Sequence, residues 1–285
     1  MKKILIIGSK GMAGHMLFEY FRDKDNYLVF GIARNTIPTE NIFNLDVSNI
    51  GRLKEIIDEN DFDAIINAIG ILNKDAEDNP AKAIWFNSYF PHQLAMLTKN
   101  SKTKIIHIST DCVFSGKGNG GYTEDSLKDG IGYYAQSKAL GEIDNNKDLT
   151  IRTSIIGPEL NDNGIGLLHW FLKQSRTSQI NGFTRAFWSG ITTLELAKVI
   201  EDTLLNDVCG LKQISREKIS KYNLLKLFNK VFRDNQVNIV ENSDYQSDKS
   251  LVSNRMDYIY EVPTYEDMLI DLKNWMKVKN FYNYE

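Results

Sequence analysis

Short apolar runs alternate with helical patterns through roughly the first 155 residues. The runs are rich in Ile, Leu and Val and are bounded by Gly, Asp or Asn, which is typical of buried strands. Strands that alternate with helices indicate a parallel sheet covered by helices on both faces. We therefore predict strands at Lys3–Ile7, Leu28–Ile32, Ala64–Ile69, Ile105–Ile108 and Leu149–Ile155.

Capping signals mark where helices begin. A helix is predicted over Tyr133–Asn145, whereas the polar stretch Asp234–Asp257 is predicted to be rich in loops. Asn79 is followed by a proline suited to the first helical position. N-caps are predicted at Asn79, Thr192, Ser220 and Thr264.

The pattern predicts an α/β fold, a Rossmann-type doubly wound parallel sheet with a smaller mixed α/β substrate lobe. Residues 1–153 and about 181–208 are expected to form an NADP-binding Rossmann domain. Residues about 154–180 and 209–285 are expected to form the substrate-binding lobe.

Composition narrows the function class. The chain has 285 residues, 42% of them hydrophobic, and a formal net charge of -3, without the basic excess that nucleic-acid binding needs. No signal peptide or membrane-spanning run is recognised. The two cysteines make no disulfide framework, so a cytoplasmic location is expected.

Three glycines follow the first predicted strand. Gly8, Gly11 and Gly14 form GxxGxxG ahead of the helix-like stretch His15–Arg22. Glycine at these places permits a tight turn and close approach of the backbone to a pyrophosphate, which the helix N-terminus attracts. The alternative is an ordinary strand–helix turn.

The end of the second predicted strand bears on the cofactor. Arg34 stands about 20 residues after the last glycine, where an NAD-specific site usually carries an acid for the ribose 2′-hydroxyl. A guanidinium can pair a 2′-phosphate, so NADPH is expected, with NADH as the alternative. Asp46 is placed to reach the adenine amino group, or else to cap the next helix.

Tyr134 and Lys138 form a YxxxK motif. Their spacing places both side chains on one face of a helix, one turn apart. A neighbouring ammonium lowers the pKa of a phenol, which lets Tyr134 pass a proton to a carbonyl oxygen. Thr110 follows the strand Ile105–Ile108, at the sheet edge where ligands bind, and its hydroxyl can donate to the same oxygen. The motif by itself is also compatible with a solvated amphipathic helix.

With these residues in order, the chain resembles the extended short-chain dehydrogenases, specifically the dTDP-4-dehydrorhamnose reductase family. The stretches that carry the resemblance are GSKGMAGH, NLDVSN, IINAIG, WFNSYFPHQLA, HISTDCVFSG, YYAQSKALGE, IRTSIIGP and VPTYEDMLIDLKNW.

The resemblance implies NADPH-dependent reduction of a 4-keto, 6-deoxy sugar on a nucleoside diphosphate, in deoxysugar and polysaccharide biosynthesis. It implies catalytic roles for Thr110, Tyr134 and Lys138, and a helical asparagine, Asn87, that orders the site. The implied cofactor-binding residues are Gly8, Gly11, Met12, Gly14, Arg34, Asp46, Val47, Ala68, Ile69, Gly70, Asn87, Tyr134 and Lys138.

Substrate contacts are expected from Asp111, Cys112, Val113, Arg185, Trp188 and Arg255. The arginines suit a diphosphate and Trp188 suits a ring, although Arg185 and Trp188 are equally compatible with surface and core positions. No protein-built metal site is expected. The nucleotide, the sugar and homodimer formation stay open.

Cys112 departs from the family, which usually has tyrosine there. Related GDP-fucose synthases carry a cysteine at this place and pair it with a histidine, for which His169 is the counterpart. A bifunctional epimerase–reductase is therefore an alternative. The segment NGFTRAFWSGITT also departs from the family pattern. A further alternative is a non-catalytic regulatory subunit on the same fold, although all three catalytic residues are present.

Overall fold

The protein is described by a computed structural model that covers residues 1–284 and separates into two compact units. The first unit contains residues 1–109, 131–151 and 201–212. The second contains residues 110–130, 152–200 and the chain from 213 onward.

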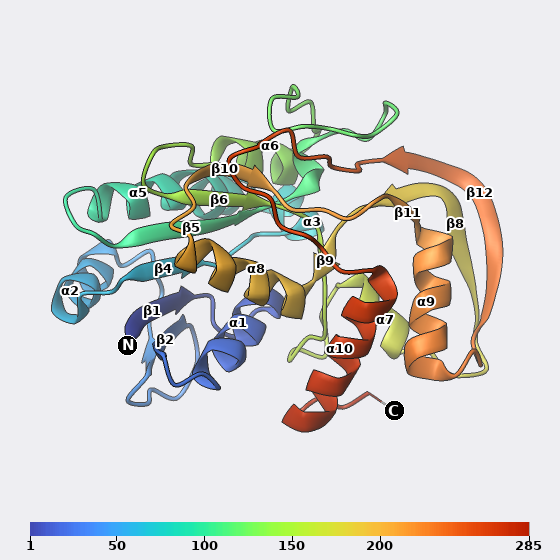
Figure 1. Cartoon of the computed structure of the whole chain (residues 1–285), viewed down its shortest axis with the longest axis horizontal. Coiled ribbons are helices and arrows are strands. Elements are labelled where there is room, and N and C mark those ends of the chain that lie inside the picture. Colours follow the sequence, from blue (N-terminus) through green and yellow to red (C-terminus); the bar gives the residue numbers. More distant parts are fainter. Residues whose placement is uncertain (285) are drawn as a thin grey trace. The chain divides into compact units, whose positions relative to one another are not determined.

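A seven-stranded sheet with the order β10-β6-β5-β4-β1-β2-β3 is centred on the first unit (Figure 1). β1 pairs in parallel with both β2 and β4, so the direction of winding reverses beside β1. This confirms the predicted doubly wound Rossmann-type fold, in which ligands bind beyond the carboxyl ends of the strands. The strands are β1 (Lys2–Ile7), β2 (Tyr27–Ala33), β3 (Ile42–Asn44), β4 (Ala64–Asn67), β5 (Lys104–Ser109), β6 (Leu149–Arg152) and β10 (Gly210–Gln213).

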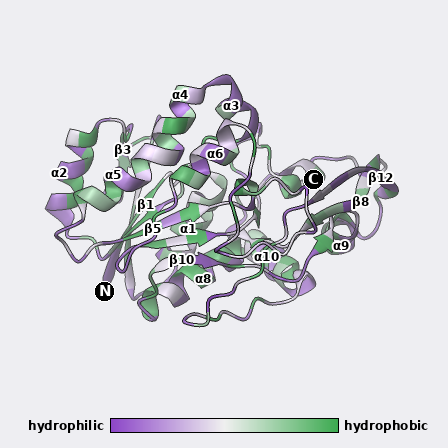
Figure 2. Cartoon of the chain, turned by 90° about the horizontal axis from the view of Figure 1, so that it is seen from above, coloured by the Kyte–Doolittle hydropathy of each residue, from purple (hydrophilic) through white to green (hydrophobic). Residues whose placement is uncertain are grey.

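The sheet strands are apolar because helices cover them. Leu5, Ile65 and Ile105 are fully buried in one core cluster, and Figure 2 shows the hydrophobic colouring on β1 and β5. Burial on both faces explains why these strands read as continuous apolar runs without alternation. The helices of this unit are α1 (Met12–Arg22), α2 (Ile50–Asn60), α3 (Asn73–Asp78), α4 (Pro80–Ala83), η1 (Ile84–Tyr89), α5 (Phe90–Leu97) and α6 (Tyr133–Leu140).

Two predicted boundaries in this region were wrong. The helix that begins at Tyr133 ends at Leu140, because Gly141 is its C-cap. The strand predicted over Leu149–Ile155 is interrupted, and β7 (Ile155–Ile156) pairs with β9 (Ile191–Thr192) in a separate sheet.

The second unit holds a smaller sheet of mixed direction. β8 (Gln179–Trp188) pairs antiparallel with β11 (Ile219–Ser220) and parallel with β12 (Asn238–Asp248). This confirms the predicted smaller mixed part of the fold. The prediction of loops over Asp234–Asp257 was wrong for β12, which is polar because most of its side chains are exposed while its backbone pairs with β8.

Three of the four predicted side-chain caps were confirmed; Asn79 precedes α4, but its side chain makes no capping hydrogen bond and donates to Asp75 instead. Thr192, Ser220 and Thr264 each accept a hydrogen bond from the backbone N–H three residues later. No helix within residues 1–284 is long and apolar enough to cross a membrane. The remaining helices are η2 (Asp111–Val113), α7 (Leu167–Leu172), α8 (Thr193–Leu205), α9 (Lys221–Arg233) and α10 (Tyr265–Lys279).

Candidate active site

The glycine loop between β1 and α1 is shaped by backbone contact. Gly8 has a φ of +86°, a conformation that side chains disfavour. A Cβ at Gly14 would lie 2.0 Å from the Gly8 carbonyl oxygen, so only glycine lets α1 pack this closely on the loop. A Cβ at Gly11 would lie 3.4 Å from that oxygen, an ordinary contact. Gly11 is therefore not required for packing and stands at the N-terminus of α1, where an anion is favoured.

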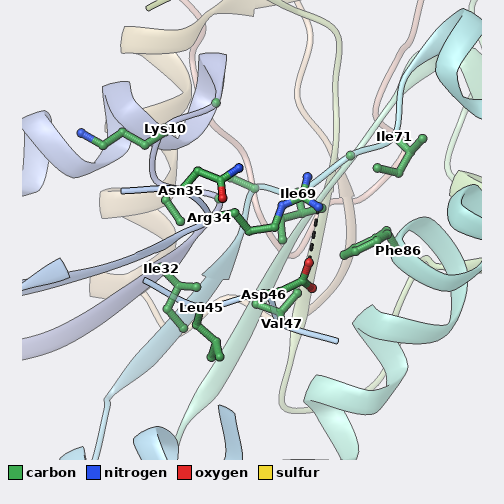
Figure 3. A pocket seen from close by; sticks show the side chains of 15 residues that line it. Lys10, Ile32, Arg34, Asn35, Leu45, Asp46, Val47, Ile69, Ile71 and Phe86 are labelled. Carbon is green, nitrogen blue, oxygen red and sulfur yellow. Dashed lines mark hydrogen bonds and ion pairs between the residues drawn. The ribbon is translucent and has the colours of Figure 1, made fainter. Parts of the chain in front are cut away.

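A cavity of about 330 Å³ opens at this loop, at the carboxyl ends of β1 and β2 (Figure 3). Eight predicted cofactor residues line it together: Gly8, Gly11, Arg34, Asp46, Val47, Ala68, Ile69 and Gly70. Met12 and Gly14 lie in the adjoining first turn of α1. Lining residues that the sequence reading missed are Lys10, Ile32, Ala33, Asn35, Leu45, Ile71 and Phe86.

Arg34 and Asp46 face each other across this cavity (Figure 3). An Arg34 Nη1 atom lies 3.4 Å from Asp46 Oδ2, and both side chains are about half exposed. The Ser48 backbone N–H, followed by Arg34, lowers the pKa of Asp46. Asp46 does not cap α2, because Asn49 accepts the capping hydrogen bond from Arg52. The exposed ion pair is weak, so Arg34 is available to a phosphate.

Asn87 lies on the π-helical turn η1 and is fully buried. Its amide oxygen accepts from the Ile71 N–H, and its Nδ2 donates to the Ile71 carbonyl and to Ser137 Oγ on α6. Asn87 therefore ties the segment after β4 to the helix that carries Tyr134. These contacts support the ordering role that the family resemblance implies for Asn87, and that role stays a prediction.

Tyr134 and Lys138 lie one turn apart on α6, in the same unit as the cavity. Tyr134 is half-buried, and its backbone N–H donates to Glu77 Oε1 at 3.2 Å. Lys138 is 3% exposed, and its Nζ donates to the Ile108 carbonyl at 2.6 Å. Burial lowers the pKa of Lys138 to about 8, against the opposing charge of Glu142. A lysine and a tyrosine one turn apart on a helix suit acid–base chemistry.

Thr110, Asp111 and Cys112 belong to the second unit and begin directly after β5. Thr110 Oγ1 lies 3.1 Å from Asp111 Oδ1 and accepts the Cys112 N–H at 3.1 Å. Burial raises the pKa of Asp111. Burial, and next the charge of Asp111, raise the pKa of Cys112 to about 11. Lys249, which sequence reading missed, lies 3.6 Å from Cys112 Sγ. Val113 is fully buried.

His169 makes contacts of its own within the second unit. Its Nδ1 lies 2.7 Å from the Tyr284 hydroxyl, and its Nε2 lies 3.3 Å from the Asp162 carbonyl oxygen. Both ring nitrogens therefore have partners other than Cys112. The residue is buried at 2% exposure, as expected of a packed helical histidine.

The predicted substrate residues of the second unit lie in different surroundings. Trp188 is buried, donates its indole N–H to Ser154 Oγ at 2.8 Å and packs on Tyr265, which leaves little of its ring for a ligand. Arg185 is exposed and hydrogen-bonded to Gln246. Trp188 thus lies in the core and Arg185 on the surface, and a substrate contact from either residue stays a prediction.

Arg255 lines a separate cavity of about 680 Å³ within the second unit. Its two Nη atoms lie 2.7 and 2.9 Å from the Asp125 carboxylate. Arg255, ahead of Asn254, lowers the pKa of Asp125 to about 2. Because it is already paired, Arg255 can bind a diphosphate only by sharing or leaving Asp125.

Comparisons with known proteins show the family and the fold. A profile of the family described as "RmlD substrate binding domain" matches residues 1–180. The probable low-salt glycan biosynthesis reductase Agl14 of Haloferax volcanii is 31% identical over 140 residues, 48% of this chain and 46% of that protein. A dTDP-4-dehydrorhamnose reductase of Aggregatibacter actinomycetemcomitans is 31% identical over 143 residues, 50% of this chain and 46% of that protein. The chain therefore spans about half the length of the curated relatives that it matches.

Among solved structures, a dTDP-4-dehydrorhamnose reductase from Bacillus anthracis in complex with NADP superposes with a TM-score of 0.79. The match covers 96% of this chain and 99% of that chain at 21% identity. At this level of identity the likeness shows a shared fold.

Proposed function

Because the chain belongs to the RmlD substrate binding domain family, we propose that it is an NADPH-dependent reductase of a nucleotide sugar. Its substrate is a 4-keto, 6-deoxy sugar on a nucleoside diphosphate, and it acts in the cytoplasm in deoxysugar and surface polysaccharide biosynthesis. The names of the relatives, a glycan biosynthesis reductase and a dTDP-4-dehydrorhamnose reductase, support this assignment.

One observation carries the proposal. Tyr134 lies one helical turn before the buried cation Lys138, in the same unit as a cavity formed by a glycine loop. Burying a lysine costs free energy because its ammonium loses water, and lysines are therefore almost never fully buried unless they are paired. Ionisable groups with perturbed pKa values concentrate at functional sites. An ammonium one turn from a phenol has a direct use, because it favours the phenolate that remains after proton donation.

The residues divide the reaction among them. Bound NADPH would supply the hydride. Gly8, Gly11 and the N-terminus of α1 would hold its pyrophosphate, and Arg34 its 2′-phosphate. The cavity fits such a group for two reasons. Gly14 lets α1 pack directly on the glycine loop, and the half-exposed Arg34 side chain can reach a phosphate.

Tyr134 would protonate the carbonyl oxygen, and Lys138 would stabilise the phenolate that is left. Thr110 has one hydroxyl proton to donate, and the substrate oxygen would compete for it with Asp111. Burial raises the pKa of Asp111, which shifts that carboxyl toward the form that competes less strongly for the hydroxyl proton.

The proposal is tested by NADPH oxidation, followed at the nicotinamide absorbance, with 4-keto-6-deoxy sugars on dTDP, UDP and GDP. We expect turnover with at least one of them and a 4-hydroxyl sugar as product. Failure of the whole panel, with NADPH bound by calorimetry, would instead support the regulatory-subunit alternative.

Cofactor choice depends on Arg34. We expect NADPH to bind more tightly than NADH, because a charge-assisted pair contributes roughly 1.5–3 kcal/mol. Arg34→Ala should reduce that preference by roughly tenfold or more. The matched control is Lys10→Ala, which also removes a cation of the cavity but should weaken both cofactors alike. Equal affinities in the unaltered protein would contradict the assignment.

A further inference from the structure

The inner end of Lys138 meets a histidine that the proposed reaction leaves without a role. Lys138 Nζ lies 3.2 Å from His107 Nε2. His107 belongs to β5 and is fully buried. The amino group therefore touches two groups of the same strand, an imidazole and the Ile108 carbonyl.

The other face of the imidazole meets Asn67. Asn67 is the last residue of β4, is fully buried and is the register partner of His107. Its Nδ2 lies 3.1 Å from His107 Nδ1. Its Oδ1 accepts the Ile69 backbone N–H at 3.2 Å. Because only the amide oxygen can accept, this backbone contact fixes which end of Asn67 faces the histidine.

The orientation of Asn67 determines the tautomer of His107. A neutral imidazole carries one N–H and one acceptor nitrogen. Nδ1 accepts from Asn67, so the proton lies on Nε2 and points at Lys138. An ammonium has three donors and no acceptor, whereas a neutral amine has a lone pair. The hydrogen bonds are therefore complete when Lys138 is the neutral amine.

The surrounding charges do not remove this bias. Burial, then Lys138, then His92 hold the pKa of His107 well below its ordinary value, so the imidazole stays neutral. Glu142, on the segment after α6, acts in the opposite direction by raising the pKa of Lys138, and it accepts a hydrogen bond from Ser109. Tyr134 lies one turn away on α6 itself.

We infer that Asn67 and His107 are positioning residues that favour the neutral amine of Lys138 and so set the pH above which its ammonium is lost. The inference rests on the proposed function, in which that ammonium stabilises the Tyr134 phenolate. In that reaction Asn67 and His107 act through Lys138 and set the alkaline limit of turnover.

The tautomer is the first test and needs no turnover. Nitrogen NMR of the protein labelled at histidine reports which ring nitrogen carries the proton. At about pH 10, well above the pKa of about 8 to which burial lowers Lys138, we expect His107 to carry its proton on Nε2. A proton on Nδ1 under these conditions would overturn the inference.

Asn67→Asp is the second test, because a carboxylate of the same shape can only accept. It would take both the Ile69 N–H and a proton on His107 Nδ1, leaving Nε2 as an acceptor for the ammonium. We expect the titration of Lys138, read from its side-chain NMR signals, to move up by about one pH unit or more. The alkaline limb of kcat/KM should move with it.

The control repeats Asn67→Asp in a His107→Phe background, which keeps a planar ring and removes both nitrogens. If the introduced carboxylate acts through the imidazole, the upward shift should fall to less than half. An undiminished shift would mean that this carboxylate acts directly through space, which would overturn the role of His107. If the double variant does not fold, the tautomer of His107 in Asn67→Asp alone decides, with a proton on Nδ1 expected and one on Nε2 excluding the inference.

These outcomes separate the two proposals. An enzyme that reduces no 4-keto nucleotide sugar but shows the expected tautomer and titration shift would contradict the proposed function and leave the network intact. An active enzyme that lacks the expected tautomer and titration shift would support the proposed function and contradict the roles inferred for Asn67 and His107.

Discussion

The cavity at the glycine loop and the small mixed sheet are built in different ways. In the first, Gly8, Gly11 and Gly14 stand within seven consecutive residues and shape the loop by contacts with each other. In the second, β8 pairs with β12, and the contact between Arg185 and Gln246 joins positions 61 residues apart. A local motif can be read from sequence because its residues determine one another's conformation, whereas a long-range pairing leaves no such pattern.

The strongest test in the unit that holds this cavity is the removal of one oxygen atom, the hydroxyl of Tyr134. Tyr134→Phe should leave the fold and NADPH binding intact while turnover falls by at least roughly a hundredfold, because the proton donor is lost. Tyr133→Phe is the matched control, since Tyr133 precedes it on the same helix and is 45% exposed. Steady-state kinetics with the accepted sugar decide, and near-full turnover of Tyr134→Phe would refute the mechanism.

The charge of Lys138 offers a test of stability. With a pKa near 8 in the folded state and about 10.4 unfolded, the native state binds a proton less readily than the unfolded state. The resulting loss of folding stability is fully present below pH 8 and disappears as the pH rises to the pKa of the unfolded state. Lys138→Met should therefore raise the unfolding free energy by about 2 kcal/mol at pH 7, after the loss of its hydrogen bonds.

Urea unfolding of both proteins at pH 7 and near pH 10 measures this, since the gain should shrink at the higher pH. Lys147→Met is a useful comparison, because Lys147 is less buried and its pKa is lowered less. A Lys138→Met protein that is less stable than the parent at pH 7 would show that the lysine contributes more than its burial costs.

Substitutions in the glycine loop can separate the glycine needed for packing from the one expected to bind the cofactor. Gly14→Ala should destabilise the fold by roughly 1–3 kcal/mol, because its Cβ would overlap the Gly8 carbonyl. Gly11→Ala should change stability by less than about 1 kcal/mol, because its Cβ meets ordinary contact distances. Thermal unfolding and NADPH titration of the two variants separate these effects. Equal destabilisation would mean that the loop acts as one rigid unit.

The sequence predicted the parts of the fold that depend on nearby residues. The strands at the start of the chain and the three side-chain caps were identified from short patterns. Eight of the fifteen residues that line the cavity at the glycine loop were expected to bind a cofactor, from the glycine motif, Arg34 and the family resemblance, and that role stays a prediction. β12 was missed because its side chains are mostly exposed and show no alternation, so only its pairing with β8 defines it. Lys249 was missed because it, too, is defined by a long-range contact: its neighbour Cys112 lies 137 residues away in the chain.

The last prediction concerns the second unit, where Cys112 raises the question of epimerisation. Cys112 can remove a sugar proton only as the thiolate, but burial and Asp111 raise its pKa to about 11. Lys249 opposes that shift without reversing it, and both His169 nitrogens are engaged by Tyr284 and Asp162. We therefore expect turnover in heavy water to leave the carbons beside the ketone undeuterated, apart from background exchange measured with Cys112→Ala. Mass spectrometry and proton NMR of the product locate any deuterium. Ring exchange that disappears in both Cys112→Ala and His169→Asn would establish the epimerase–reductase, because each residue would then be needed to move a proton that simple reduction never touches.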